Sequence, residues 1–317
     1  MLDVLYFIVP ITIASAAPLI FTAIGGVFSE RSGVINIGLE GLMIMGAFIG
    51  ILFNLFFADT FGAWTPWISL IVAMLVSALF ASLHAIASIS FRADQVVSGV
   101  AINMLGLAIA LFSVKMIFDK GQTDFIQQKI PRFNVPYLQD IPIIGPMFFK
   151  LVYGSSIIAI AVAIIAWFVI YKTPFGLRLR SVGEHPMAAD TMGIKVTKIR
   201  YIAVIISGGL AGIGGAVYSQ TITNDFGHAT INGQGFMALA AMIFGKWHPL
   251  GAMGAALFFG FAQALAISSS SIKILAGIPS VYFLIFPYVL TILALAGFLG
   301  KASAPKALGK PYIKGNR

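Results

Sequence analysis

The sequence predicts an all-α polytopic membrane protein with about nine transmembrane helices. Of its 317 residues, 59% are hydrophobic and only 10% are charged, whereas about 25% of the residues of a soluble domain are charged. So few charges cannot cover a water-facing surface, which excludes a soluble enzyme, a nucleic-acid-binding protein and a disordered chain. The apolar residues gather in nine runs, at 4–28, 34–58, 63–91, 95–118, 153–171, 201–220, 232–244, 250–270 and 275–299.

We expect these runs to be helices. Most are close to the roughly 20 residues that a helix needs to cross a bilayer, and they lack the alternation of a transmembrane β-barrel. Residues 1–13 contain no Lys or Arg, whereas a secretory signal peptide begins with a positive region, so the first run is predicted to be a retained span. The run at 232–244 rises only about 20 Å and is either a tilted crossing or a re-entrant helix.

The basic residues predict the orientation and explain the net charge of +9. Segment 172–200 carries six Lys and Arg residues against two acids, and 301–317 carries five with no acid. Because Lys and Arg collect in cytoplasmic segments, both are predicted to be cytoplasmic, which requires the run at 232–244 to cross. We therefore expect a transmembrane domain over 1–300, with the N-terminus outside and an outer loop at 119–152, and a basic cytoplasmic tail at 301–317.

Two segments are weakly similar to each other. Ile35–Met43 and Ile231–Met237 share Ile, Asn, Gly and Met at matching places if a gap is allowed, and each opens a predicted helix from a different side of the membrane. Inverted repeats are common in transporters. A chain rich in Gly and Met also produces such a similarity by chance, and the sequence leaves both interpretations open.

No motif of an enzyme is present. The chain has no Cys and contains none of the patterns G-x-x-x-x-G-K-[ST], H-E-x-x-H and G-x-S-x-G, which serve phosphate binding, zinc binding and nucleophilic catalysis. We expect no catalytic residue, no metal site and no cofactor bound by this chain.

Glu40 is an acid inside a predicted span, within the glycine-rich segment Gly33–Gly41. A charge at membrane depth is costly and usually faces a cavity or a partner, so Glu40 is a candidate for lining a translocation path. Three amides in predicted spans are further candidates: Asn36, Asn103 and Gln263. In the alternative interpretation, Glu40 pairs with Arg31 or a backbone donor, and all four side chains only join helices.

The loop 172–200 contains a predicted short helix. Pro186 suits its first turn, Ala188 and Ala189 continue it, and Gly193 is placed to end it. A short amphipathic helix held between two spans can dock into a groove of a partner protein. An inert linker would not need such ordered ends.

Four segments resemble the permeases of ABC importers, in the family that contains the branched-chain amino acid, ribose and nucleoside permeases. They are Ser29–Gly46, Gly176–Ile194, Gly208–Gly215 and Gly235–Gly245, and the resemblance covers nearly the whole chain. Residues 29–41 are most similar to the nucleoside subgroup. The extra N-terminal span of ribose-type permeases is not expected, which suggests the shorter subunit of a heterodimeric pair.

The resemblance implies an importer in a bacterial cytoplasmic membrane. An extracellular lipoprotein would deliver a nucleoside, this chain and a larger homologous permease would form the path, and a cytoplasmic ATPase would bind ATP and Mg²⁺. The loop 172–200 would then be a coupling loop that receives the motion of the ATPase. Its coupling residues would be Gly176, Arg178, Arg180, Gly183, Glu184, Pro186, Ala188, Ala189 and Gly193.

Three other functions stay open at this point. A permease for a sugar such as ribose, or for branched-chain amino acids, would have similar spans, because the binding protein largely sets specificity. An ion-coupled secondary transporter usually needs intramembrane carboxylates, and Glu40 alone is thin support for it. A membrane enzyme would need a catalytic group that the sequence does not provide.

Overall fold

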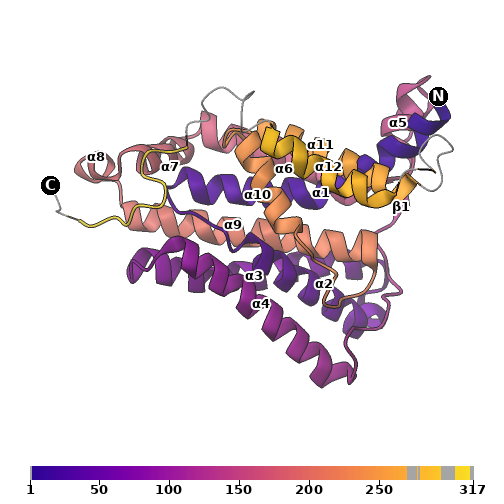
Figure 1. Cartoon of the computed structure of the whole chain (residues 1–317), viewed down its shortest axis with the longest axis horizontal. Helices are drawn as coiled ribbons and strands as arrows, with labels where there is room; N and C mark the ends of the chain where they lie inside the picture. The colour runs from indigo at the N-terminus through magenta and orange to yellow at the C-terminus, as the bar shows by residue number, and fades with distance from the viewer. Residues whose placement is uncertain (1, 270–276, 278, 294–303, 315–317) are drawn as a thin grey trace.

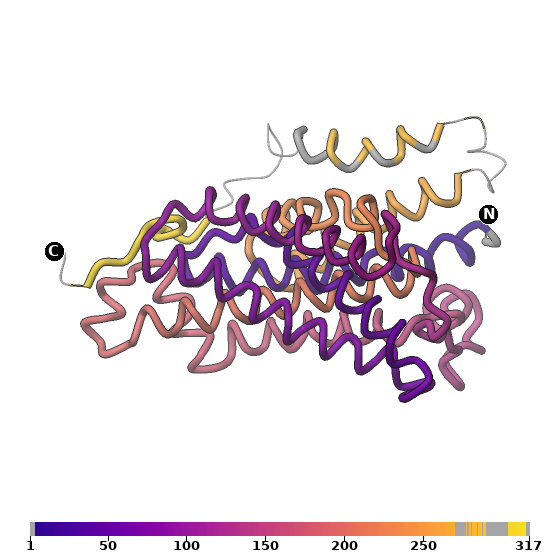
Figure 2. Tube along the Cα trace, turned by 90° about the horizontal axis from the view of Figure 1, so that it is seen from below, coloured from indigo at the N-terminus to yellow at the C-terminus, as the bar shows by residue number. Residues whose placement is uncertain are grey.

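The computed structural model describes residues 2–269, 277, 279–293 and 304–314. These residues form a bundle of long helices, with the N-terminus at one end and residues 304–314 at the other (Figures 1 and 2). The longer helices are α1 (Leu2–Arg31), α2 (Leu39–Phe61), α3 (Thr65–Ala85), α4 (Gln95–Phe118), α6 (Gly154–Lys172), α9 (Val196–Tyr218), α11 (Pro249–Ser268) and α12 (Ser280–Leu293).

Short elements connect the long helices. They are the turns η1 (Gly62–Trp64), η2 (Ile86–Ser90), η3 (Leu138–Asp140) and η4 (Ser219–Thr223), the helices α5 (Ile144–Phe148), α7 (Pro174–Glu184), α8 (Pro186–Thr191) and α10 (Gln234–Phe244), and the strands β1 (Arg132–Phe133) and β2 (Val152–Tyr153). The two strands pair antiparallel and close the segment between them into a small hairpin-like loop.

Among the described residues, six helical segments are long and apolar enough to cross a membrane, which confirms a mostly helical, multi-pass membrane protein. One of the six, Leu39–Ser90, contains both α2 and α3, which turn at η1 and pack against each other. Helix α10 has 11 residues and rises about 16 Å, about half of the hydrocarbon core. The run expected at 275–299 lies partly outside the described residues, so the count of nine spans and the orientation stay predictions.

The loop 172–200 contains two helices where the sequence analysis expected one. Thr173 caps α7 by accepting a hydrogen bond from the Gly176 N–H at 3.2 Å, and Pro174 occupies the first turn. The chain then leaves the helical conformation at His185 (φ −142°, ψ 80°) before α8 begins at Pro186. A residue that precedes proline is biased away from the helical conformation, which explains the break.

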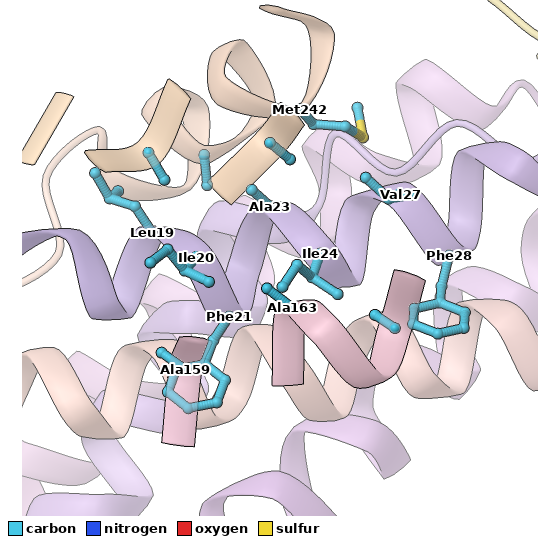
Figure 3. Packing of buried hydrophobic residues seen from close by; sticks show 14 of the residues in the cluster. Leu19, Ile20, Phe21, Ala23, Ile24, Val27, Phe28, Ala159, Ala163 and Met242 are labelled. Atoms are coloured by element: carbon cyan, nitrogen blue, oxygen red, sulfur yellow. The ribbon is translucent and has the colours of Figure 1, made fainter. Parts of the chain in front are cut away.

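Helix α1 forms the centre of the bundle and packs against α6, α9, α10 and α11. Figure 3 shows apolar side chains of α1, from Leu19 to Phe28, facing Ala159 and Ala163 of α6 and Met242 of α10. In lipid, the hydrophobic effect does not drive helices together, so helix packing depends on close van der Waals contact. Small residues permit that contact. The alanines of α6 supply this contact.

Helix α9 approaches α2 and α3 closely through its glycines. A Cβ placed on Gly212 would lie 2.5 Å from the Ser77 side chain of α3, and a Cβ on Gly46 of α2 would collide with the Gly212 backbone. The close approach expected of Gly208–Gly215 is therefore present. These glycines are needed for space rather than for backbone flexibility.

Helices α1–α3 and α9–α11 pack in corresponding ways. Helix α3 packs along α9 as α11 packs along α1, and α2 lies between α3 and α9 as α10 lies between α11 and α1. Helices α1 and α9 run antiparallel, because Arg200 near the start of α9 hydrogen-bonds Ser32 beyond the end of α1. This correspondence favours the inverted-repeat interpretation of the similarity between Ile35–Met43 and Ile231–Met237.

Candidate functional site

Residues 32–38 join α1 to α2 without helical structure and are called the elbow. Backbone groups inside a membrane protein need internal partners, and neighbouring helices provide them. The Ile35 N–H donates to Gln95 Oε1 of α4 at 2.7 Å, and the Ile35 carbonyl lies 2.9 Å from His84 Nε2 of α3. At the start of the elbow, Gly33 has a φ of +90°, a conformation that favours glycine.

Asn36 and Asn103 hold the elbow and the first turn of α2. The fully buried Asn36 donates through Nδ2 to Ser207 Oγ of α9 at 2.9 Å. Asn103 of α4 donates to the Ile37 carbonyl at 3.0 Å and accepts from the Gly41 N–H at 2.7 Å. Asn103 lies eight residues into α4, or about 12 Å along it, so α2 begins well inside the bundle.

The carboxylate of Glu40 joins the start of α2 to the start of α10. Its Oε1 accepts from the Gly233 N–H at 2.6 Å and its Oε2 from the Gly235 N–H at 2.5 Å. These three residues are called the Glu40 clasp. Helix N-termini carry unpaired N–H groups and partial positive charge, and the clasp places one carboxylate where two such termini meet. This arrangement explains how an acid that is only 7% exposed is accommodated.

The clasp agrees with the alternative interpretation of Glu40, in which the carboxylate pairs with backbone donors and joins helices. Arg31 does not take part, because its guanidinium donates to the Trp247 carbonyl at 2.8 Å and to the Tyr171 hydroxyl at 3.1 Å. Both oxygens of Glu40 are occupied by protein donors. A role for Glu40 in lining a translocation path stays a prediction.

Gln263 of α11 reaches the clasp only through another amide. Its Nε2 donates to Gln234 Oε1 at 2.9 Å, and Gln234 is the first residue of α10. The structure thus brings Asn36, Asn103 and Glu40 together around the elbow. Gln263 lies on α11 and contacts the first residue of α10. Gln234 is a functional candidate that was not predicted from the sequence, although Gln234-Gly235 matches Glu40-Gly41 in the similarity between the two segments.

Of the nine predicted coupling residues, three are buried, three are exposed, and Arg180, Glu184 and Pro186 are half-buried. Gly176, Gly183 and Ala189 are buried. A Cβ on Gly176 would collide with carbonyl oxygens of α6, and a Cβ on Gly183 would collide with the Arg31 carbonyl. These residues fix the loop to the body of the bundle.

The exposed coupling residues are Arg178, Ala188 and Gly193, which lie at the end of the bundle that carries α7 and α8. Gly193 ends the α8 segment with a φ of +81°, and Pro186 begins it, as the sequence predicted. The guanidinium of Arg180 lies 4.9 Å from the Tyr171 ring centroid, and Glu184 Oε2 accepts from the Lys306 N–H at 3.4 Å.

His248 is the last residue of the turn that joins α10 to α11. Its Nδ1 accepts a hydrogen bond from the Gly251 N–H at 3.4 Å and so caps α11. Burial, and after it the nearby Arg31 guanidinium, lower the pKa of His248 from its ordinary value of 6.5. The neutral imidazole that the cap requires is therefore favoured.

Comparison with known proteins gives three full-length or nearly full-length relationships. Residues 9–295 match the family described as "Branched-chain amino acid transport system / permease component". The chain is 64% identical over 99% of both chains to the guanosine ABC transporter permease protein NupQ of Bacillus subtilis, and 50% identical over 98% of both chains to the nucleoside ABC transporter permease protein NupC of Lactococcus lactis. It is also 26% identical to the guanosine ABC transporter permease protein NupP of Bacillus subtilis, over 85% of this chain and 75% of NupP.

Proposed function

The chain belongs to the family of permease components of branched-chain amino acid transport systems, and we propose that it is one permease subunit of an ATP-driven nucleoside importer. The observation that carries this proposal is the 64% identity with a guanosine permease over 99% of both chains. It favours a nucleoside over the sugar or amino acid alternatives. The chain is a transport component, and hydrolysis of ATP belongs to a separate ATPase that binds ATP and Mg²⁺.

A second, larger permease completes the path. NupQ and NupP of one Bacillus strain are both described as guanosine permeases, and this chain is far more similar to NupQ. The same alignment covers 85% of this chain but 75% of NupP, so NupP is the longer protein. This pairing supports a heterodimer of a shorter and a longer permease, supplied with substrate by an extracellular nucleoside-binding lipoprotein.

The chain crosses a bacterial cytoplasmic membrane nine times, with its N-terminus outside. The Lys and Arg residues of 172–200 and 301–317 support a cytoplasmic position for the end that carries α7, α8 and residues 304–314. Helix α10 then covers only the cytoplasmic half of the membrane. The non-helical segment 224–233 before α10 covers the outer half, whereas the elbow before α2 lies on the cytoplasmic side.

The path for the nucleoside passes the place where α2 and α10 begin. Discontinuous helices that start at the membrane midplane form substrate sites in many transporters, and this is where Asn36, Glu40, Asn103 and Gln263 are found. A nucleoside is polar and needs hydrogen-bonding groups in an otherwise apolar tunnel. The elbow and the clasp concentrate such groups.

The coupling loop transmits the motion of the ATPase. Its exposed α8 projects from the end of the bundle (Figure 1), while Gly183 packs against the Arg31 carbonyl at the end of α1. A push on α8 therefore acts through α7 on the helix that leads into the elbow. The contact at Gly183 leaves no room for a larger side chain.

The proposal is tested in a reconstituted complex of both permeases, the ATPase and the binding lipoprotein. We expect Glu184→Arg and Gly183→Pro to abolish nucleoside uptake and the stimulation of ATP hydrolysis while membrane insertion survives. Glu184→Gln, which keeps an acceptor for the Lys306 N–H, is the matched control. Normal stimulation in both disruptive variants would overturn the coupling assignment, and uptake that follows an ion gradient without ATP would identify a secondary transporter.

A further inference from the structure

Residues 304–314 lie against the helix bundle and form what we call the strap. Ala307 is only 5% exposed, and its N–H donates to the Gly183 carbonyl at 2.9 Å. Two residues further on, the Gly309 N–H donates to the Gly33 carbonyl at 3.2 Å. The strap therefore hydrogen-bonds both the end of α7 and the elbow.

Arg200 of α9 joins the strap and the elbow a second time. Its side chain is 1% exposed, Nε donates to the Ser32 carbonyl at 3.2 Å, and Nη1 donates to the Lys310 carbonyl at 3.0 Å. The planar guanidinium can serve two acceptors at once in a fixed geometry. Burying a charge is costly unless it is well hydrogen-bonded, so these two contacts are needed to keep Arg200 where it is.

The elbow continues this connection into the bundle. It begins at the Ser32 and Gly33 carbonyls that Arg200 and the strap hold, and it leads into the first turn of α2, where the Glu40 clasp joins α2 to α10. A displacement of the strap therefore has a hydrogen-bonded route to the start of α2 and from there to α10. None of these links depends on α8.

The strap also forms one wall of a groove beside the coupling loop. Residues 184–187 line one side and residues 306, 307 and 310–313 the other, around a volume of about 470 Å³. The exposed side chains on the strap side are Lys306, Lys310, Pro311 and Ile313. This mixture of basic and apolar groups is continuous with the loop 172–200 and suits an acidic, partly apolar protein surface.

We propose that the strap is a second coupling element: the ATPase contacts it together with α8, and Arg200 ties it to the elbow as a positioning residue. This inference rests on the proposed function, because it adds a contact to the same partner. It assigns a role to the C-terminal segment beyond its positive charge. Two independent experiments test it, one for the contact and one for the transmission.

The contact is tested by photo-crosslinking in the assembled transporter. A photo-reactive amino acid at Ile313, which is 39% exposed, is expected to crosslink to the ATPase, as is the same probe at Ala188 of α8. Tyr137 is 90% exposed and lies in the chain between β1 and α5, which Figure 1 shows at the other end of the bundle, so it is the control position and should give no such product. A probe that crosslinks from Ala188 but not from Ile313 overturns the strap as an ATPase contact.

The transmission is tested by the number of nucleosides moved per ATP hydrolysed. Arg200→Lys keeps the charge but cannot hold both carbonyls as a fork, and Ala307→Pro removes the N–H that binds Gly183. We expect each to lower the ratio about fivefold or more, since coupling energies of this kind correspond to such factors. Thr197→Ala, at an exposed position on the first turn of α9, should leave the ratio unchanged.

The outcomes separate this inference from the function itself. An unchanged ratio in both variants, or a loss of uptake and ATP hydrolysis in the same proportion, means that the strap and Arg200 only stabilise the fold, and the inference fails. If the variants give either of these results and the wild-type complex moves nucleosides with ATP, the proposed function still stands. If the wild-type complex moves no nucleoside at all, the proposed function fails first.

Discussion

Glu40 and Gly235 hold the first turns of α2 and α10 together. The carboxylate accepts the Gly235 N–H at 2.5 Å, and a Cβ on Gly235 would lie 2.5 Å from the Glu40 backbone. Two helices that begin inside the bundle thus share one carboxylate and touch without an intervening side chain. Neither helix can shift relative to the other without changing this contact.

Removal of the carboxylate is expected to impair uptake more than assembly. Hydrogen bonds to charged groups contribute about 1.5–3 kcal/mol each, and about 1.4 kcal/mol corresponds to a tenfold change in rate. We expect Glu40→Ala to lower nucleoside uptake about tenfold or more per inserted protein. Glu40→Gln, whose amide has a single acceptor oxygen, should be intermediate. Unchanged uptake kinetics in Glu40→Ala would show that the clasp has no part in transport.

Addition of one methyl group at the clasp should have the same effect. Gly235→Ala places its Cβ against the backbone and carboxylate of Glu40, so α10 must move away from α2. We expect uptake to fall by about tenfold. Gly254→Ala is the matched control, because a Cβ at this position of α11 meets no atom within 4 Å. Equal uptake by the two variants would contradict the close contact.

The indole of Trp247 stabilises a buried acid at the end of α1. Its Nε1 donates to Glu30 Oε2 at 2.6 Å, and Glu30 is only 5% exposed. Trp247→Phe leaves that oxygen without its donor, and an unsatisfied buried group costs about 1–3 kcal/mol or more. We expect a lower unfolding temperature of the purified subunit in detergent.

A double variant checks this explanation. Glu30→Gln in the Trp247→Phe background replaces the buried charge by a neutral amide, which costs less to bury. The double variant should unfold at a higher temperature than Trp247→Phe alone. If instead the two substitutions destabilise additively, Trp247 acts through its packing volume and not through its N–H.

The cap formed by His248 makes stability depend on pH. Because the folded pKa lies below the ordinary 6.5, folding favours the neutral ring, so the stabilisation is present above pH 6.5 and is lost as the pH falls through the lowered pKa. Asn caps helices well and does not titrate. Between about pH 7.5 and about pH 5, the unfolding temperature of the wild type should fall more than that of His248→Asn. Parallel curves for the two proteins would exclude His248 as the titrating group.

Helix positions were largely predictable because they depend on local composition. Each of the nine apolar runs overlaps a helix among the described residues, since a segment in lipid must satisfy its own backbone. Helix α7 of the loop 172–200 was missed. Its sequence signals were available: Thr173 before it, Pro174 as its first residue and the X-Pro break after it at His185.

The partners of the polar residues were not predictable in the same way. Glu40 could be identified as unusual from its place in an apolar run, but its hydrogen bonds join residues 193 and 195 positions apart. The strap had no apolar pattern, and its lysines indicated only a cytoplasmic location. Its contacts with Gly183 and Gly33 are made by backbone groups, which leave no side-chain signal in a sequence.

By itself, the sequence determined that the chain is a polytopic helical membrane protein and, through four segments, which transporter family it resembles. Both follow from local properties: apolar length, the placement of Lys and Arg, and short motifs. Only the tertiary structure decided that Glu40 joins α2 to α10 and that Arg200 connects α9, the elbow and the strap. The physical reason is that a buried charge must find donors or acceptors wherever helix packing places them, and that placement depends on segments far apart in the chain.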